Sequence, residues 1–329
     1  MNILVTGGAG YIGSHTVKML QDMGENVVAY DNLVKGHREA VKCNAFVQGD
    51  IFDSALLEET IKKYNIDSVV HFAAFSLVGE SMEKPEIYYK NNVQGTLNLL
   101  EVMLKCNVKK LVFSSTAAVY GEPEVVPITE ESLKNPTNVY GRTKLIMENA
   151  MADYSKAYGL KYIALRYFNA CGADESGEIG EDHNPESHLI PLVLQACLGQ
   201  RENIKIFGND YPTKDGTCIR DYIHVNDLAK AHIQALKALY NGHESAAYNL
   251  GNGVGFSVRE IIEAAERVTG KSLKKEIATR RAGDPATLIA SCEKAKKDLG
   301  VTMEYTDIEE IIETAYKWHK NHLVGYGDK

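Results

Sequence analysis

Short hydrophobic segments alternate with longer amphipathic segments along the first half of the chain. The hydrophobic segments span residues 2–6, 26–30, 45–48, 68–72, 110–115 and 162–167, and helical patterns occur at 12–23, 54–64, 86–106 and 140–158. Strands that alternate with helices are typical of βαβ units, and strands that are hydrophobic throughout indicate that helices cover both faces of the sheet. The pattern therefore predicts an α/β fold built on a doubly wound parallel sheet.

This alternation changes after about residue 168. Residues 169–187 are rich in Gly, Asp, Glu, Asn and Pro, and helical patterns return at 189–199, 226–240, 257–269, 293–299 and 307–321. With 329 residues the chain is longer than a usual single domain. We expect two units, 1–168 and 169–329, of which the second is a smaller α/β domain with some segments returning to pack on the first. The cleft between them is the expected ligand site.

Glycines recur at every third position directly between the first predicted strand and the first predicted helix. They are Gly7, Gly10 and Gly13, and Asp31 ends the next strand. Glycine permits the sharp turn there and lets a pyrophosphate approach the N–H groups at the helix N-terminus. The Asp31 carboxylate would accept hydrogen bonds from ribose hydroxyls and repel a 2′-phosphate, which favours NAD over NADP. These features predict a Rossmann-type domain that holds NAD as cofactor.

Composition and charge exclude several classes of protein. The chain carries 36 Lys plus Arg against 44 Asp plus Glu, and this net charge of −8 argues against a nucleic-acid partner. No apolar run approaches the roughly 18 residues of a membrane helix, so we expect no membrane partner and a cytoplasmic location. The six cysteines show no C-x-x-C pair and are expected to be reduced thiols. Histidine pairs such as His183/His188 lack helical ligand spacing, so no metal is expected.

Tyr140 and Lys144 lie four residues apart in the helical pattern at 140–158, hence on one helix face. An ammonium group and the positive nicotinamide ring are expected to lower the pKa of the Tyr140 phenol, which is ordinarily about 10, and so to make it a base. Thr116 ends an earlier predicted strand and would bring a hydroxyl close to the cofactor. The pair Tyr316/Lys320 has the same spacing near the end of the chain, and we interpret it as part of a surface helix.

Several segments together carry a resemblance to a known family. They read TGGAGYIGSHT at 6–16, Asp31-Asn32, HFAA at 71–74, NNVQGT at 91–96, SSTAAVYGEP at 114–123, YGRTK at 140–144, RYFNACGA at 166–173 and IFGNDYPTKDGTCIRDYIHVNDLA at 206–229. In combination they resemble the UDP-glucose 4-epimerase family of the extended short-chain dehydrogenase/reductases, from residue 1 to about residue 325.

The resemblance implies an isomerase that works through hydride transfer to and from one tightly held NAD, with a role in galactose metabolism. Tyr140 would take the proton of the sugar 4-hydroxyl, and Thr116 would hydrogen-bond the developing 4-keto oxygen. Lys144 would bind the nicotinamide ribose and tune Tyr140. The 4-keto sugar would turn about its link to UDP and receive the hydride on its opposite face.

Further contacts are implied position by position. The expected NAD contacts are Gly7, Gly10, Tyr11, Ile12, Gly13, Asp31, Asn32, Asp50, Ile51, Phe72, Ala73, Ala74, Asn91 or Asn92, Tyr140, Lys144 and Phe168. The expected nucleotide-sugar contacts are Thr116, Tyr140, Asn169, Leu189, Phe207, Arg220, Tyr222, Arg281, Asp284 and Leu288. Among these, Arg220 and Arg281 suit a diphosphate because a guanidinium group binds phosphate oxygens in pairs.

Three positions depart from the family pattern. Ser76 stands where many relatives have lysine, and His188 stands where relatives often have asparagine, so we expect the corresponding contacts to be lost or replaced. Leu288 aligns with a position that is tyrosine in enzymes confined to UDP-glucose and UDP-galactose and smaller where N-acetylated sugars are accepted. We therefore expect the hexose pair as main substrates, with side activity on UDP-GlcNAc and UDP-GalNAc.

Other functions remain as alternatives at this point. A nucleotide-sugar 4,6-dehydratase needs an added acid and base after the strand-end threonine, and here those places hold Ala117 and Ala118. A UDP-glucuronate 4-epimerase would need a cation for the sugar carboxylate, which the sequence does not identify. A non-catalytic NAD sensor would usually lack the tyrosine or the lysine, and both are present.

The helical patterns near 86–105 and 140–158 carry apolar residues on more than one face. Such residues usually pack in a core, but the resemblance implies that these helices pair in a four-helix interface of a homodimer. The apolar residues are Tyr88, Leu99, Leu100, Met103, Met147, Met151 and Tyr154.

Overall fold

The computed structural model describes residues 1–281 and 284–327. Within these residues, seven strands form one parallel sheet in the order β10-β6-β5-β4-β1-β2-β3. The strands are β1 (Asn2–Thr6), β2 (Asn26–Asp31), β3 (Ala45–Gln48), β4 (Ser68–His71), β5 (Lys110–Thr116), β6 (Lys161–Tyr167) and β10 (Ala246–Leu250). The predicted doubly wound parallel sheet is confirmed, and its crossover point lies between β1 and β4.

Helices cover both faces of this sheet because successive side chains of each buried strand point to opposite faces. Ile3 and Val5 pack with one helix layer, and Leu4 between them packs with the other. The first layer contains α1 (Tyr11–Asp22), α8 (Val225–Tyr240) and α10 (Glu293–Leu299), and the second contains α2 (Ser54–Lys63), α5 (Gly95–Lys105) and α6 (Val139–Tyr158). Strands hydrophobic throughout are therefore explained by burial on both sides.

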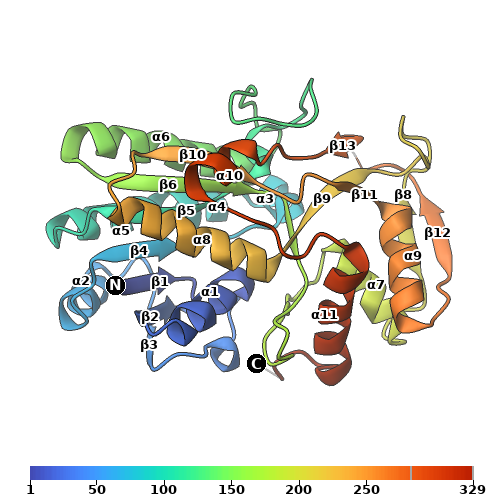
Figure 1. Ribbon diagram of the computed structural model, residues 1–329, viewed down its shortest axis with the longest axis horizontal. Coiled ribbons are helices and arrows are strands. Elements are labelled where there is room, and N and C mark those ends of the chain that lie inside the picture. Colours follow the sequence, from blue (N-terminus) through green and yellow to red (C-terminus); the bar gives the residue numbers. More distant parts are fainter. Residues whose placement is uncertain (282–283, 328–329) are drawn as a thin grey trace.

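The remaining elements form a smaller α/β unit at the right of Figure 1. Strand β9 (Ile219–His224) pairs with β7 (Asn169–Cys171), β11 (Gly255–Ser257) and β13 (Thr287–Leu288), and β8 (Ile204–Phe207) pairs with β12 (Lys275–Ala278). Helices α7 (Leu189–Cys197), α9 (Val258–Thr269) and α11 (Ile308–Asn321) share a separate core with Ile204 and Ile206. Three elements from the second half of the chain, α8, β10 and α10, lie instead in the layers of the large sheet (Figure 1).

The predicted helix at 86–106 is interrupted. It is divided into α4 (Pro85–Tyr88), a π-helical turn η2 (Tyr89–Gln94) and α5. The Asn92 side chain in this turn donates to Phe75 O and accepts from Phe75 N, both at 2.9 Å. The wider turn thus holds a tertiary contact to the loop after β4, as π-turns at functional sites often do. Short helices η1 (Arg38–Ala40), α3 (Val78–Glu83) and η3 (Ala117–Val119) complete the described elements.

The apolar residues of the helical patterns near 86–105 and 140–158 lie mainly inside the chain. Tyr88, Leu99, Leu100, Met103, Met147 and Met151 are each 0% exposed and belong to the core clusters. Only Tyr154 of that set is partly exposed. These six residues pack in the core, as such residues usually do, because the helix faces that carry them cover the parallel sheet and the loop after β4. In the described part of the chain no helix is long and apolar enough to span a membrane.

A buried ion pair joins α6 to the sheet beneath the predicted catalytic residues. Arg166 Nε on β6 donates to the two carboxylate oxygens of Glu148 at 3.0 and 3.2 Å, and the two side chains are 5% and 7% exposed. Ser115 Oγ donates to the same carboxylate, and Arg166 Nη1 donates to Tyr120 OH at 2.8 Å. The pair therefore fixes α6 relative to the end of β5.

We expect Glu148→Gln to lower the free energy of unfolding by about 3–5 kcal/mol, because it leaves the Arg166 charge buried without a counter-charge. Urea denaturation followed by circular dichroism would measure this change. The matched control is Glu244→Gln, which breaks the exposed pair of Glu244 with Lys161 and should change stability little. Equal stability of the two variants would show that the buried pair does not hold α6.

Candidate active site

The glycine turn between β1 and α1 has the geometry of a phosphate site. Gly7 has a φ of +72°, and a Cβ there would lie 2.6 Å from Ala73 N. A Cβ at Gly13 would lie 2.1 Å from Gly7 O, whereas one at Gly10 would meet only Gly7 O at 3.4 Å. The first glycine thus makes the turn, the third permits close packing, and the second keeps the helix N-terminus open.

The N-terminus of α1 presents free donors to this opening. The first N–H groups of a helix have no partner within it, and no side chain caps α1. Tyr11, Ile12 and Gly13 supply these N–H groups, and the positive end of the helix dipole favours an anion there. The residues present therefore fit the pyrophosphate of a dinucleotide such as NAD.

The acidic residue at the end of β2 lies against the same turn. Asp31 Oδ2 accepts from Ala9 N at 3.0 Å, and Oδ1 accepts from Leu33 N at 2.8 Å. Asn32 Nδ2 donates to Asp50 Oδ2 at 2.9 Å, next to the buried Ile51. The structure thus brings together four of the residues expected to contact NAD, namely Asp31, Asn32, Asp50 and Ile51.

The loop after β4 closes another side of the turn. Phe72, Ala73 and Ala74 run past Gly7, and the Asn92 amide holds the next residue of this loop, Phe75, by its backbone. Of the two asparagines considered, Asn92 is the buried one. Ser76 is exposed on the same loop.

The expected catalytic residues converge at the carboxyl end of β5. Lys144 Nζ donates to Ser114 O at 2.7 Å and lies 6.0 Å from the centroid of the Tyr140 ring. The Thr116 hydroxyl lies close enough to the Tyr140 phenol to act on its pKa. Asn138 caps α6 by accepting from Gly141 N at 2.8 Å, so the first turn of this helix holds Tyr140 beside the strand.

Sequence reasoning missed two residues that position this group. Ser81 Oγ accepts from Tyr140 N at 3.1 Å, and the carbonyl of Ser114 binds the Lys144 ammonium. The sequence around Tyr140 does not point to Ser81, because Ser81 lies 59 residues earlier, in the short helix α3. The side chains of Ala117 and Ala118, which follow Thr116 in η3, offer no acid or base, and this disfavours the dehydratase alternative.

The groups of the chain itself act on the Tyr140 pKa in opposite directions. Burial raises the pKa of Tyr140 to about 12, although the Thr116 hydroxyl acts in the opposite direction. Burial also lowers the pKa of Lys144 to about 7, against the effect of the Glu148 carboxylate. Both changes have the same cause, since a dry environment disfavours the phenolate and the ammonium ion alike.

The expected nucleotide-sugar residues gather on the β7-β9-β13 sheet. Asn169 pairs with Tyr222, and Leu288 pairs with Arg220. Leu288 also packs in one cluster with Phe168. The neighbouring β strands therefore place residues from distant parts of the sequence beside the end of the large sheet.

Two arginines lie at this sheet and at its neighbour. Arg220 Nη1 donates to Pro285 O at 2.8 Å, and its Nη2 lies 3.6 Å from an Asp284 carboxylate oxygen. The Arg281 guanidinium lies 4.1 Å from the centroid of the Phe207 ring. Leu189 stands apart from this group as the first residue of α7.

A cluster next to Leu189 was also missed from the sequence. Glu181, His183, Glu186 and His188 place one donor atom each within 4.8 Å of one another. Metal ligands at helical spacing do not describe this cluster, because the four residues lie in a loop. The spacing E-x-H-x-x-E-x-H was the available signal.

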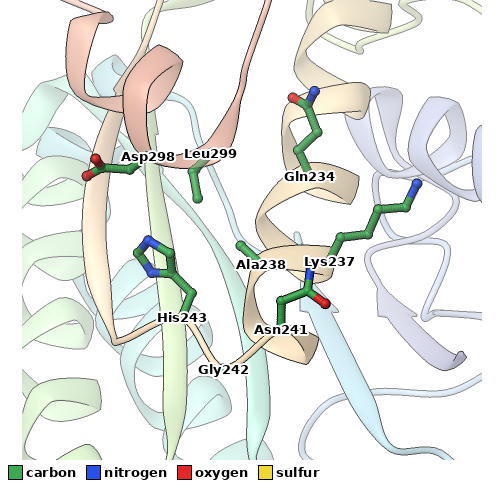
Figure 2. A pocket seen from close by; sticks show the side chains of 8 residues that line it. All are labelled: Gln234, Lys237, Ala238, Asn241, Gly242, His243, Asp298 and Leu299. Atoms are coloured by element: carbon green, nitrogen blue, oxygen red, sulfur yellow. The ribbon is translucent and has the colours of Figure 1, made fainter.

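The hollow in Figure 2 is a different place. It has a volume of about 390 Å³ and lies between the end of α8 and α10, with Lys237, His243 and Asp298 among its lining residues. Since His243 precedes β10, this hollow lies at the amino edge of the parallel sheet. Thr116 and the glycine turn lie at the carboxyl edge, so the hollow takes no part in the candidate site.

Comparisons with known proteins agree with this site. The family model described as "NAD dependent epimerase/dehydratase family" matches residues 3–251. A UDP-glucose 4-epimerase of Halalkalibacterium halodurans is 57% identical over 99% of this chain and 98% of its own length.

Solved structures show the same fold. One of a UDP-glucose 4-epimerase is 56% identical, covers 100% of both chains and has a TM-score of 0.98. The enzyme of Bifidobacterium longum, in complex with NAD⁺ and UDP, is 40% identical, covers 99% of this chain and 100% of its own, and has a TM-score of 0.93. The resemblance inferred from the sequence is thereby confirmed: the chain belongs to the NAD dependent epimerase/dehydratase family and, within it, to the UDP-glucose 4-epimerases, which are isomerases.

Proposed function

We propose that this protein interconverts UDP-glucose and UDP-galactose by oxidising and re-reducing the sugar at carbon 4, and that it serves galactose metabolism. The observation that carries the proposal is the convergence of Tyr140, Thr116 and Lys144 at the end of β5. Because all six cysteines are free thiols, we place the enzyme in a reducing compartment, the cytoplasm.

Each of these residues has one role in the proposed reaction. NAD, when bound, accepts the hydride from carbon 4 and returns it. Tyr140 removes the proton from the 4-hydroxyl group and later gives it back, as a general base and acid. Thr116 orients the reacting oxygen by hydrogen bonding, and Lys144, held by Ser114 O, adds positive charge near the phenol.

The cofactor is held by the large-sheet part of the chain. We assign the pyrophosphate to the N–H groups at the start of α1 and the adenosine ribose to Asp31. The loop after β4, which Asn92 fixes, borders the nicotinamide end together with Tyr140 and Lys144. Residues 1–168 thus form the NAD-binding part in this proposal.

The nucleotide sugar is bound mainly by residues 169–329. Arg220 and Arg281 bind the diphosphate, and Asn169, Leu189, Phe207, Tyr222, Asp284 and Leu288 line the rest. Contacts far from carbon 4 hold the UDP end, so that the sugar itself can present either face to the cofactor. This explains how one site can act on both epimers.

Side activity on N-acetylated sugars is part of the proposal. Leu288 is partly buried against the cluster of Val119, Tyr120 and Ile128, and its side chain leaves more room than a tyrosine would. A structural neighbour from Campylobacter jejuni, 42% identical, is named a UDP-Glc/GlcNAc 4-epimerase. We propose that the hexose pair remains the preferred one.

We further propose a homodimer in which α5 and α6 of two copies pair. Six of the apolar residues lie in the core, so we assign the interface to partly exposed apolar residues of the same segments. These are Val93, Leu97, Ala150 and Tyr154.

The first test incubates the purified protein with UDP-galactose without added NAD and separates the products. We expect UDP-glucose to form until equilibrium, because NAD copurifies with the chain. Formation of a 4-keto-6-deoxy sugar would contradict the proposed reaction.

In parallel incubations UDP-GalNAc should react more slowly than UDP-galactose, and an equal or faster rate would overturn the substrate ranking.

Tyr140→Phe should reduce the epimerisation rate by about 10²–10⁴-fold, the usual contribution of a general acid–base group. NAD content, measured after denaturation, should stay unchanged because the ring remains. The matched control is Tyr316→Phe, since Tyr316 also has a lysine four residues later, with Lys320 Nζ 5.7 Å from its ring centroid. A Tyr140→Phe enzyme as fast as this control would end the assignment of the base.

Sedimentation at micromolar concentration should give the mass of two chains. Replacing Leu97 by Glu should shift the protein toward the monomer, because it buries a charge without a partner in the proposed interface. A wild-type monomer would contradict the proposed pairing. Glu263→Gln, an exposed residue of α9 in the smaller unit, serves as the control.

A further inference from the structure

Four side chains of the loop before α7 point their donor atoms at one another. His183 Nδ1 lies 3.1 Å from Glu181 Oε1 and 3.8 Å from Glu186 Oε2. His188 Nδ1 lies 2.7 Å from Glu181 Oε1 and 3.1 Å from Glu186 Oε1. The same nitrogen of each ring therefore faces both carboxylates.

The two carboxylates of this cluster are buried together. The Glu181 and Glu186 side chains are 4% and 6% exposed. In the described part of the chain their only ion-pair partners are His183 and His188. Two buried negative charges need compensating positive charge, which protonated imidazoles or a bound cation can provide.

A divalent transition metal supplies this charge with neutral imidazole ligands. Zinc prefers four ligands of nitrogen, oxygen or sulfur in a tetrahedron, with bonds of about 2.0–2.2 Å. Neighbouring ligand atoms are then roughly 3.3–3.6 Å apart. The separations of 2.7–3.8 Å between the carboxylate oxygens and the Nδ1 atoms lie on both sides of this value. Since the four ligand atoms lie within 4.8 Å of one another, side-chain shifts of about 1 Å would bring them to tetrahedral separations.

We propose that Glu181, His183, Glu186 and His188 form a structural binding site for one zinc-like divalent cation. The site is separate from the reacting group at Tyr140 and does not depend on the proposed reaction. The His188 side chain is 44% exposed, which gives the ion a path from solvent. Because carboxylates raise the pKa of His188, protons compete for the same nitrogen, and the affinity increases with pH.

The surroundings indicate what the ion would stabilise. Trp318 Nε1 on α11 donates to Glu181 O at 3.1 Å, and the Tyr11 ring, at the start of α1, lies 6.1 Å from the His183 ring. Leu189 follows His188 directly and begins α7. A bound ion would therefore hold the loop between the cofactor turn and two helices of the smaller unit.

The test uses the full chain with its NAD, stripped of metal with a chelator and dialysed at pH 8 against Zn²⁺. Elemental analysis should then find one zinc per chain. Single variants His183→Asn and His188→Asn should lose this ion, and His243→Asn, which removes a histidine from the hollow of Figure 2, should keep it. Circular dichroism and NAD content would show that each variant is folded.

Two further readouts make the result independent of enzyme activity. Zn²⁺ should raise the unfolding temperature of the wild type and of His243→Asn but not of the two cluster variants. Co²⁺ in place of zinc should give the intense visible absorption of a tetrahedral site. Substoichiometric zinc in the wild type, or equal binding by all four proteins, would overturn the proposal and leave protonated histidines as the partners of the carboxylates.

Discussion

The site depends on the strands of the large sheet all running in one direction. Parallel strands end at one edge, so β1, β2, β4 and β5 deliver the glycine turn, Asp31, the Phe72 loop and Thr116 to a single place. Helix α1 starts at the same edge, so its N-terminus faces the others. A ligand that spans this edge meets the N–H groups at the start of α1 at one end and the Tyr140 phenol at the other. Sheet topology therefore determines which residues can act together.

Burial of Tyr140 at this edge raises the pKa of its phenol and so opposes its proposed role as a base. Bringing the pKa of Tyr140 from about 12 to near 7 requires roughly 7 kcal/mol of preferential stabilisation of the phenolate. A full charge at the distance of Lys144 supplies roughly 3 kcal/mol at an effective dielectric constant of about 20. Burial lowers the pKa of Lys144 to about 7, so even this charge is incomplete at neutral pH. In the proposed reaction the positive nicotinamide ring and Thr116 would supply the larger share, so that the strength of the base would depend on the oxidised cofactor.

The sequence predicted well where local pattern and burial agree. Ile3, Leu4 and Val5 are hydrophobic because both faces of β1 are covered, and the glycines of the turn are required by contacts within a few residues. The sequence did not predict features that depend on contacts between residues far apart in the chain. The π-turn at Asn92 follows from hydrogen bonds to Phe75, and the place of β10 beside β6 follows from sheet pairing late in the chain. Spacing also showed that Lys144 lies near Tyr140, but not that burial raises the pKa of this phenol.

The loop at 172–188 shows why cofactor and substrate parts act as one unit. Tyr11 OH donates to Gly172 O at 2.6 Å, and Lys35 Nζ donates to Asn184 O at 3.2 Å. His37 Nε2 lies 3.0 Å from Asp182 O, so three residues around the cofactor turn hold one loop. That loop leads directly into α7 at Leu189, on the proposed substrate side. Displacement of the glycine turn would therefore move the start of α7, so this loop couples the proposed cofactor and substrate parts.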